Sequence, residues 1–473
     1  MQDNTSHATD PGVVGPRIAE RLGSMSGRAY SVADIRVLPA GASRTTYALT
    51  ITDDESGEST AVIVRAAPAA SPGEGGLAAE GQVLRAAFAA GVPVPEVLDL
   101  SDTADDPGVL GFPYAVMSFV DGESIPRRIL RDEAYAPARA GFARQAGAIL
   151  ARIHAMDSAA TGLTAVGDPL EALRTQMTRE YDHAPAGLVL AIDWLSRNRP
   201  ETSGETVVHG DFRLGNLLIQ PDGVAAVLDW ELAHLGDPIE DLGWLCAKAW
   251  RFGVAEPVAG MGSRADLLDG YAEVAGRRPT EATLHWWELY ATVKWGLICG
   301  KQAARYLDGT ERSMELAAIG RRSAEQEFDV LLALGLASPL SVPDPLAEEQ
   351  DDLTSEDPHL APTALDLLES VTAYLTDEVA TDPGVSGHVR FHTRVANNVL
   401  ATVRRQLVLG ERQAAASRKR LSDIGVSGSA ELADALRDGT LSATDPAVQA
   451  VVTAEVIDRL TVANPRHLSQ PDC

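Results

Sequence analysis

Two polar residues in one short segment have the types and the spacing that phosphoryl transfer requires. Asp211 and Asn216 are five residues apart in the segment His-Gly-Asp-Phe-Arg-Leu-Gly-Asn, between two apolar runs. Phosphoryl transfer uses a carboxylate that accepts or orients the proton of the acceptor hydroxyl, and an oxygen ligand that keeps Mg²⁺ on the triphosphate. An Asp-x-x-x-x-Asn loop supplies both groups from one turn.

A second carboxylate follows thirteen residues after Asn216, where Asp229 ends an apolar run. The intervening Pro-Asp-Gly (221–223) between two apolar runs predicts a β-hairpin. Such a hairpin can return Asp229 to the side of Asn216 as a second metal ligand. Each piece alone also fits a structural role, as a turn aspartate or a helix N-cap. The three together, spaced around a hairpin, favour the catalytic interpretation.

The elements that must position these residues can be read from the hydrophobic periodicity. Through about residue 120, β-branched runs (IRVLPA, YALTIT, AVIVRAA, EVLDLS and 112–120) predict a mostly antiparallel sheet. One long helix is expected at 77–90. After residue 121 the pattern is mainly helical, and we expect a helix over 138–156. Residues 340–362 are acidic and rich in proline, which is typical of a solvated linker.

Composition and charge exclude several classes of protein. The 473 residues include 67 acidic and 40 basic residues, so the net charge of -27 should repel nucleic acid and anionic lipid. No apolar run approaches the ~20 residues that span a bilayer, and the polar N-terminus does not resemble a secretory signal. Three cysteines fit a reducing cytoplasm. Lysine occurs at four positions, the first of them Lys248, so arginine must supply any basic group before it.

Three segments, HGDFRLGNLLI, VLDWE and HLGDPIEDLGWL, resemble the aminoglycoside phosphotransferase family, relatives of the protein kinases. The resemblance covers about residues 20–335 and is greatest to the phosphotransferase domains fused to some acyl-CoA dehydrogenases. It implies an α+β, protein-kinase-like two-lobed fold, with an antiparallel β N-lobe and a mainly helical C-lobe. ATP and Mg²⁺ would bind in the cleft. A C-terminal all-α domain, similar to a helical domain of unknown function, would be appended.

The family motif also implies roles for individual residues. Asp211 would be the catalytic aspartate, and Asn216 and Asp229 the metal ligands. Asp237 and Asp241 would brace the catalytic loop or cap a helix.

In the N-lobe, Gly41, Ala42 and Ser43 would cover the phosphates with backbone N–H groups, although an ordinary hairpin loop is an equal alternative. Arg65 ends the third strand, where a kinase-like fold has its phosphate-contacting lysine. Arginine keeps that charge with a different geometry, and Glu80 in the following helix is its expected partner.

The strand that contains Met117 and Phe119 would be the hinge whose backbone binds adenine, with a plain core strand as the alternative. Gly210 and Trp230-Glu231 replace residues that protein kinases use for activation-loop control, so we expect an enzyme that is not switched by activation-loop phosphorylation.

The expected organisation has five parts. They are a flexible tail (1–20), the ATP-binding N-lobe (21–121), the C-lobe (122–339), the acidic linker (340–362) and the C-terminal helical domain (363–466).

The sequence therefore predicts an ATP- and Mg²⁺-dependent phosphotransferase with a hydroxylated small molecule as acceptor. By resemblance, a hydroxyacyl-CoA or similar metabolite ranks ahead of an aminoglycoside. The main alternative is a nucleotide-binding pseudokinase that acts as a scaffold through its C-terminal helices, and a protein kinase acting on Ser or Thr is disfavoured. No nucleic acid or membrane partner is expected, and the sequence leaves the oligomeric state open.

Overall fold

The computed structural model describes residues 9–38, 44–67, 76–101, 109–347 and 362–471. The chain falls into two compact units that each combine distant parts of the sequence. Unit 1 comprises residues 1–166, 201–246 and 256–284, and unit 2 comprises residues 167–200, 247–255 and 285–473.

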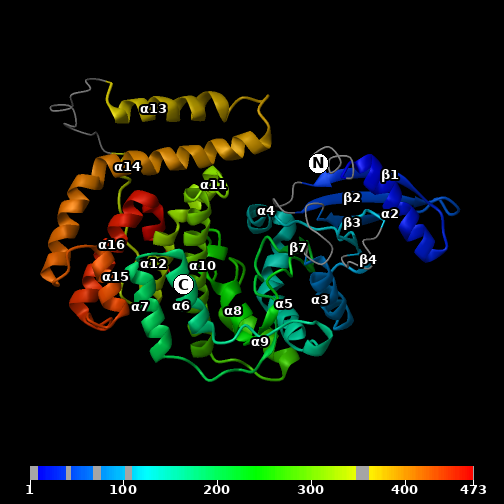
Figure 1. Cartoon of the computed structure of the whole chain (residues 1–473), viewed down its shortest axis with the longest axis horizontal. Helices are drawn as coiled ribbons and strands as arrows, with labels where there is room; N and C mark the ends of the chain where they lie inside the picture. Colours follow the sequence, from blue (N-terminus) through cyan, green and yellow to red (C-terminus); the bar gives the residue numbers. More distant parts are fainter. Residues whose placement is uncertain (1–8, 39–43, 68–75, 102–108, 348–361, 472–473) are drawn as a thin grey trace. The chain divides into compact units, whose positions relative to one another are not determined.

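Unit 1 begins with a five-stranded sheet in which every neighbouring pair of strands is antiparallel (Figure 1). The strand order is β1-β2-β3-β5-β4. The strands are β1 (Tyr30–Leu38), β2 (Thr45–Asp53), β3 (Ser59–Ala66), β4 (Val97–Ser101) and β5 (Tyr114–Ser118). The antiparallel N-terminal sheet predicted from the β-branched runs is thus confirmed.

Helix α2 (Pro11–Ser26) packs against this sheet and takes in the second half of the segment expected to be a flexible tail. The helix starts at Pro11 because Asp10 caps it, accepting a hydrogen bond from the N–H of Gly12 at 2.8 Å. Val14 and Ile18 are fully buried in the same core as the strand residues. Burial of this apolar face orders the helix.

Helix α3 (Leu77–Ala89) carries Glu80 and lies close to β4. A Cβ on Gly81 would stand 2.6 Å from a methyl group of Leu100, so only glycine allows this approach. The helix predicted at 77–90 is confirmed, and its position fixes Glu80 beneath the sheet.

The remainder of unit 1 holds the loop between Val208 and Leu217. Strands β7 and β8 form the predicted hairpin and pair Leu217 with Val227. Strands β6 and β9 form a second antiparallel pair. The elements are α4 (Pro126–Arg131), α5 (Ala136–His154), β6 (Thr206–Val208), β7 (Leu217–Gln220), β8 (Gly223–Val227), β9 (His234–Gly236), α8 (Ile239–Cys246) and α9 (Arg264–Ala275).

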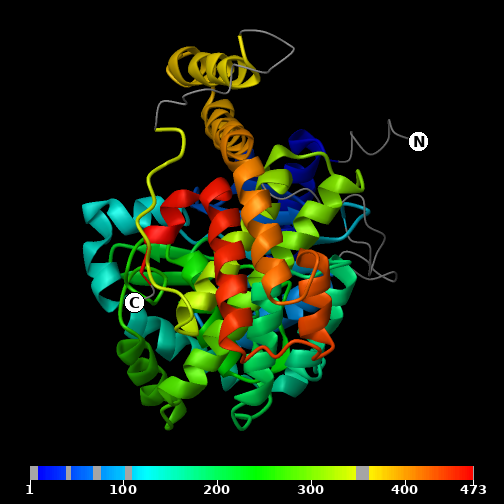
Figure 2. The same cartoon turned by 90° about the vertical axis from the view of Figure 1, so that its left-hand side faces the viewer.

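Unit 2 is helical, and it includes the C-terminal helices that were expected from the sequence. Helices α14 and α16 lie side by side (orange and red in Figure 2), joined by ion pairs from Arg420 to Glu455 and Asp458. The helices are α6 (Pro169–Glu180), α7 (Ala186–Arg197), α10 (Glu281–Leu307, whose first turn belongs to unit 1), α11 (Met314–Gly320), α12 (Ser323–Ala333), α13 (Ala364–Tyr374), α14 (Gly387–Asp423), α15 (Ser429–Arg437) and α16 (Pro446–Ala463).

Helix α12 is buried along nearly its whole length and holds three acidic residues that pair with the C-terminal segment. Glu327 binds Arg459 at 2.7 Å, and Asp329 binds His467 at 2.8 Å. Lys248 also binds Asp329, at 2.9 Å. Burial alone would raise the pKa of Asp329, but its contacts with His467 and Lys248 lower it overall. Helix α12 is therefore buried against the C-terminal segment and is also joined to it by buried ion pairs and hydrogen bonds.

Residues 340–347 of the expected linker are described and are anchored. Asp344 forms a two-pronged ion pair with Arg405, and the N–H of Leu340 donates to the carbonyl of Leu468. The remainder of the linker, 348–361, lies outside the described residues. Within the part of the chain that the structure describes, no helix has both the length and the apolar composition needed to cross a membrane.

Candidate active site

The loop that carries Asp211 and Asn216 joins β6 to β7 in unit 1. Phe212 and Leu214 alternate with the polar residues and are fully buried, so they anchor the loop to the core. Gly215 has a φ of +104°, which an L side chain rarely adopts. The alternation leaves Asp211 and Arg213 on the more exposed side of the loop.

Three donors hold the carboxylate of Asp211. Its Oδ1 accepts from Arg213 Nε at 2.9 Å and from Trp244 Nε1 at 2.8 Å, and its Oδ2 accepts from Asn216 Nδ2 at 2.7 Å. The side chain of Asp211 is 13% exposed, so the held carboxylate still reaches solvent. A carboxylate fixed in this way is suited to orient a hydroxyl group and to receive its proton.

Asp229 comes beside this loop through the hairpin. The N–H of Leu228 donates to the carbonyl of Asn216 at 2.8 Å, which ties the residue before Asp229 to the loop. Asp229 has a φ of +66°, a strained conformation for a residue other than glycine. Burial raises the pKa of its carboxyl group, the charge of Glu231 adds to the rise, and the charge of Arg65 opposes it. The charges of Glu80 and Asp211 raise the pKa further.

Asn216 and Asp229 fit the donor set of a magnesium ion. Both hydrogen bonds of the Asn216 side chain use its Nδ2, so its amide oxygen makes none among the described residues. Magnesium is usually held by one or two carboxylates, waters and substrate phosphates, and not by a cage of protein ligands. In the described ranges, no group of three or more His, Cys, Asp or Glu side chains is placed so that it could hold a metal ion.

Arg65 forms the expected ion pair with Glu80. Glu80 also binds Arg44, whose Nη1 lies 2.6 Å from Oε2. The side chain of Glu80 is 4% exposed, whereas those of Arg44 and Arg65 are 17% and 21% exposed. One buried glutamate thus holds two guanidinium groups, so the three side chains together carry a net positive charge.

The structure describes only some of the other N-lobe residues that were proposed from the sequence. Gly41, Ala42 and Ser43 lie outside the described residues. Met117 is buried in β5, opposite Ile63 of β3 and Val97 of β4. Phe119 is 46% exposed, and its N–H donates to the carbonyl of Ala61. Arg65 and Glu80 thus form the expected ion pair, and Met117 and Phe119 lie in β5 and just beyond its end.

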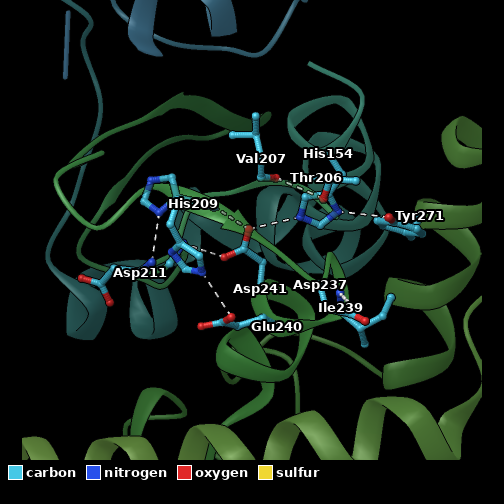
Figure 3. A network of polar contacts seen from close by, with 12 residues as sticks. His154, Thr206, Val207, His209, Asp211, Asp237, Ile239, Glu240, Asp241 and Tyr271 are labelled. Carbon is cyan, nitrogen blue, oxygen red and sulfur yellow. Dashed lines mark hydrogen bonds and ion pairs between the residues drawn. The ribbon is translucent and has the colours of Figure 1, made fainter. Parts of the chain in front are cut away.

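Asp241 supports the catalytic loop from behind (Figure 3). Its carboxylate accepts the N–H of His209 at 2.8 Å and the N–H of Gly210 at 2.9 Å. His154 Nε2 lies 3.1 Å from the same carboxylate, and Tyr271 lies on the other ring nitrogen at 3.0 Å. Burial would raise the pKa of Asp241, but its hydrogen bonds with His154 and with the backbone N–H of His209 lower it overall.

His209 has the neutral form that its contacts require. Its Nδ1 accepts the N–H of Asp211 at 3.2 Å, so its Nε2 carries the proton and donates to the carbonyl of Leu228 at 3.1 Å. Burial lowers the pKa of this imidazole. His209 thereby links the residue before Asp229 to Asp211.

Asp237 has the structural role predicted for it. Its Oδ1 accepts the N–H of Ile239 at the start of α8, and its Oδ2 accepts the N–H of Ser203 at 2.7 Å. Gly210 has a φ of +81°, and a Cβ there would stand 2.5 Å from the carbonyl oxygen of Leu232. No arginine can occupy this position without a backbone shift, in agreement with the expected absence of an arginine that reads a phosphorylated loop.

Three residues at the site were not singled out from the sequence. Arg213 lies two residues after Asp211, so its proximity was visible in the motif itself. Arg44 is the cation of the small-residue loop, and the shortage of lysine could have drawn attention to it. Trp244 is thirty-three residues from Asp211, and no local pattern links the two.

The antiparallel sheet, the Asp-Asn loop and the returning hairpin together define a phosphotransferase of kinase-like fold. Residues 34–277, just over half of the chain, match the model of the phosphotransferase enzyme family named APH. The chain belongs to this family. Residues 383–467 match a domain of unknown function, DUF6285.

Several proteins of known name are similar to part of this chain. The chain is 32% identical to acyl-CoA dehydrogenase family member 10 of Mus musculus over 44% of this chain and 19% of that protein. It is 30% identical to family member 11 of Gallus gallus over 55% of this chain and 36% of that protein. The matched segments thus span about a fifth and about a third of these relatives.

A solved structure from Ralstonia eutropha, provisionally described as an aminoglycoside phosphotransferase, matches 67% of this chain and 97% of its own. The TM-score is 0.52 at 23% identity, so the likeness concerns the fold. The kinase-like fold and the family predicted from the motifs are confirmed.

Proposed function

We propose that the chain is an ATP- and Mg²⁺-dependent phosphotransferase that transfers the γ-phosphoryl group to a hydroxyl of a small molecule. The observation that carries the proposal is the grouping of Asp211, Asn216 and Asp229 around one loop and hairpin of unit 1, with Arg65 in electrostatic range. A turn aspartate or a helix cap would explain one of these residues, but not a strained Asp229 beside a tethered Asp211.

In this reaction the acceptor oxygen forms a bond to the γ-phosphorus. The bond between that phosphorus and the bridging oxygen of ATP breaks, and ADP leaves with its electron pair. The hydroxyl proton passes to Asp211, whose carboxylate is already oriented by Asn216 and Trp244. Asn216 and Asp229 would hold Mg²⁺, which when bound neutralises charge on the phosphates.

Arg65 performs the task of the usual lysine in this proposal. Its guanidinium is fixed by Glu80, so it can present a positive charge to the nucleotide phosphates without first being ordered. Positioning and electrostatic stabilisation contribute most of the rate enhancement in phosphoryl transfer. The ion pair of Arg65 with Glu80 is already formed and partly exposed, so the guanidinium charge is positioned before the nucleotide binds.

The proposed acceptor is a hydroxyacyl-CoA or a similar hydroxylated metabolite. The support is that the matched relatives are called acyl-CoA dehydrogenases, a name that connects this kind of domain with acyl-CoA chemistry. We place the reaction in a reducing compartment such as the cytoplasm, because the chain has only three cysteines, too few for a disulfide framework.

The first experiment is a thermal-shift titration with ATP, with and without Mg²⁺. Ligand that binds the native state raises the melting temperature by mass action. We expect a shift that depends on Mg²⁺ in the wild type and is lost in Asp229→Ala. Asp222→Asn, in an exposed turn, is the control and should behave as the wild type. No shift at millimolar ATP or GTP would refute nucleotide binding.

The second experiment measures turnover with a panel of hydroxyacyl-CoAs and aminoglycosides. Asp211→Asn should lower turnover by ~10²–10⁴-fold while the ATP-induced shift is kept. Equal turnover in the variant would reject Asp211 as the proton acceptor. A shift with ATP but no product from any acceptor would favour the pseudokinase, for which Arg65 in place of lysine is the supporting observation.

A further inference from the structure

The Asp211 carboxylate receives a hydrogen bond from outside its own loop. Trp244 lies on α8 and is 3% exposed, and its Nε1–H reaches Asp211 Oδ1 at 2.8 Å. The second donor to that oxygen, Arg213, lies two residues from Asp211 in the same loop, and its side chain is 27% exposed. The two donors therefore differ in how firmly they are held.

Helix α8 is fixed in the core, so a side chain on this helix can hold the loop in one position. All eight of its residues are buried. Asp237 caps its first turn, and Asp241 on the same helix binds two backbone N–H groups of the loop. The indole of Trp244 has only two rotatable side-chain bonds and lies in the core, so its N–H direction is set by the helix. Arg213 has a long, partly solvated side chain that loses more conformational entropy when it is ordered.

The hydrogen bonds also distinguish the two oxygens of Asp211. A carboxylate oxygen has about two lone-pair sites, and both sites of Oδ1 are used by Arg213 and Trp244. Oδ2 accepts one hydrogen bond, from Asn216, and keeps one site. The acceptor hydroxyl must therefore give its proton to Oδ2, on the side of the loop that carries Asn216.

We propose that Trp244 is a positioning residue for phosphoryl transfer, which fixes the Asp211 carboxylate to helix α8 so that Oδ2 faces the acceptor hydroxyl. The inference rests on the proposed function, since it requires Asp211 to accept the hydroxyl proton. It assigns to α8 a part in the chemistry in addition to its support of the loop backbone through Asp241.

The test is the substitution Trp244→Phe, which removes the N–H and keeps an aromatic ring in the core. Turnover is followed with 3-hydroxybutyryl-CoA, and ATP hydrolysis, with water as the acceptor, is the second readout. We expect kcat to fall by ~10–100-fold, the size typical of one lost hydrogen bond to a charged group. The KM for ATP and the ATP-induced thermal shift should not change, because Trp244 does not contact the nucleotide in this proposal.

A matched control separates the lost N–H from a general packing defect. Trp286 is 2% exposed, and its Nε1 donates to the carbonyl of Leu195 at 2.9 Å in unit 2. Trp286→Phe therefore removes a buried indole N–H from a hydrogen bond elsewhere and should leave kcat unchanged. Incorporation of β-(3-benzothienyl)alanine at position 244, which has the shape of tryptophan without the donor, gives the same test if the phenylalanine variant is unstable.

A double-mutant cycle with Asp211→Asn decides between positioning and structural roles. If Trp244 acts through Asp211, Trp244→Phe should cause no further loss of kcat in the Asp211→Asn background. An equal loss in both backgrounds, or an unchanged kcat in the single variant, would overturn the proposal. If Asp211→Asn alone leaves turnover intact, Asp211 is not the proton acceptor, and the positioning role of Trp244 falls with it. If the wild type forms no product from any acceptor, the proposed function itself has failed, and this is established before the cycle is interpreted.

Discussion

Asp241 offers the sharpest test of how the catalytic loop is held, through the substitution Asp241→Asn. The residue is fully buried, and its carboxylate accepts the N–H of His209, the N–H of Gly210 and a hydrogen bond with His154. Asparagine has one acceptor oxygen, and its amide N–H₂ group would face a backbone N–H. At least one buried donor loses its partner, and the negative charge opposite His154 is lost.

The expected loss of stability follows from these contacts. An unsatisfied buried group costs about 1–3 kcal/mol, and removal of one partner of a buried pair typically costs about 3–5 kcal/mol. We therefore expect the free energy of unfolding of unit 1 to fall by about 3–5 kcal/mol, a large part of the roughly 5–15 kcal/mol of a typical domain. Turnover should fall as well, because Asp211 follows these two backbone amides directly.

Urea unfolding gives the stability, and hydrogen exchange of the His209 and Gly210 amides reports the local effect. Both amides should exchange faster in Asp241→Asn by more than the rest of unit 1. Asp222→Asn, the same chemical change in an exposed turn, should remain within about 0.5 kcal/mol of the wild type. A loss below about 1 kcal/mol with unchanged exchange would refute the view that Asp241 holds the loop.

Three further predictions concern the same unit. Gly210→Ala should lower the free energy of unfolding by more than Gly57→Ala. Both glycines have positive φ, which costs an alanine about 1–2 kcal/mol, but only at Gly210 does a carbonyl oxygen lie 2.5 Å from the new Cβ. Equal urea midpoints for the two variants would contradict this prediction. Stability should decrease as pH falls below about 6.5, because burial lowers the pKa of His209 in the folded state while the unfolded chain takes up the proton at its ordinary pKa. Urea midpoints between pH 5 and 8 measure this dependence, and His209→Gln should flatten it. Arg65→Met should abolish most of the ATP-induced thermal shift, whereas Arg65→Lys should keep part of it, because lysine retains the charge without the two-pronged geometry; a full shift in Arg65→Met would remove Arg65 from the proposed phosphate site.

The parts of the site that are close in the chain could be predicted from the sequence. Asp211 and Asn216 share one short loop, and the turn Pro221-Asp222 returns the chain so that Leu228 bonds to Asn216. Loop closure over so few residues is entropically cheap and is governed by turn chemistry, which is a property of the local sequence. The alternation of apolar residues likewise predicted the antiparallel sheet and the helices after it.

The start of the chain shows where local reasoning is weaker. Residues 1–20 were expected to form a flexible tail, yet Val14 and Ile18 are fully buried against the sheet. A single apolar face is a short-range signal, but the surface that covers it comes from strands 20 to 100 residues away. Whether such a helix is ordered depends on that surface, since most helical stability in proteins comes from tertiary packing.

The sequence by itself thus determined the family, the fold class and the identity of the candidate catalytic and metal-binding residues, because residue type and short spacing specify that chemistry. Only the tertiary structure decided what holds those residues in place. Trp244 on Asp211, Arg44 on Glu80 and Asp241 beside His154 join residues 33 to 87 positions apart. Such contacts leave no periodic trace along the chain, since they depend on which buried surfaces meet when the helices and strands pack.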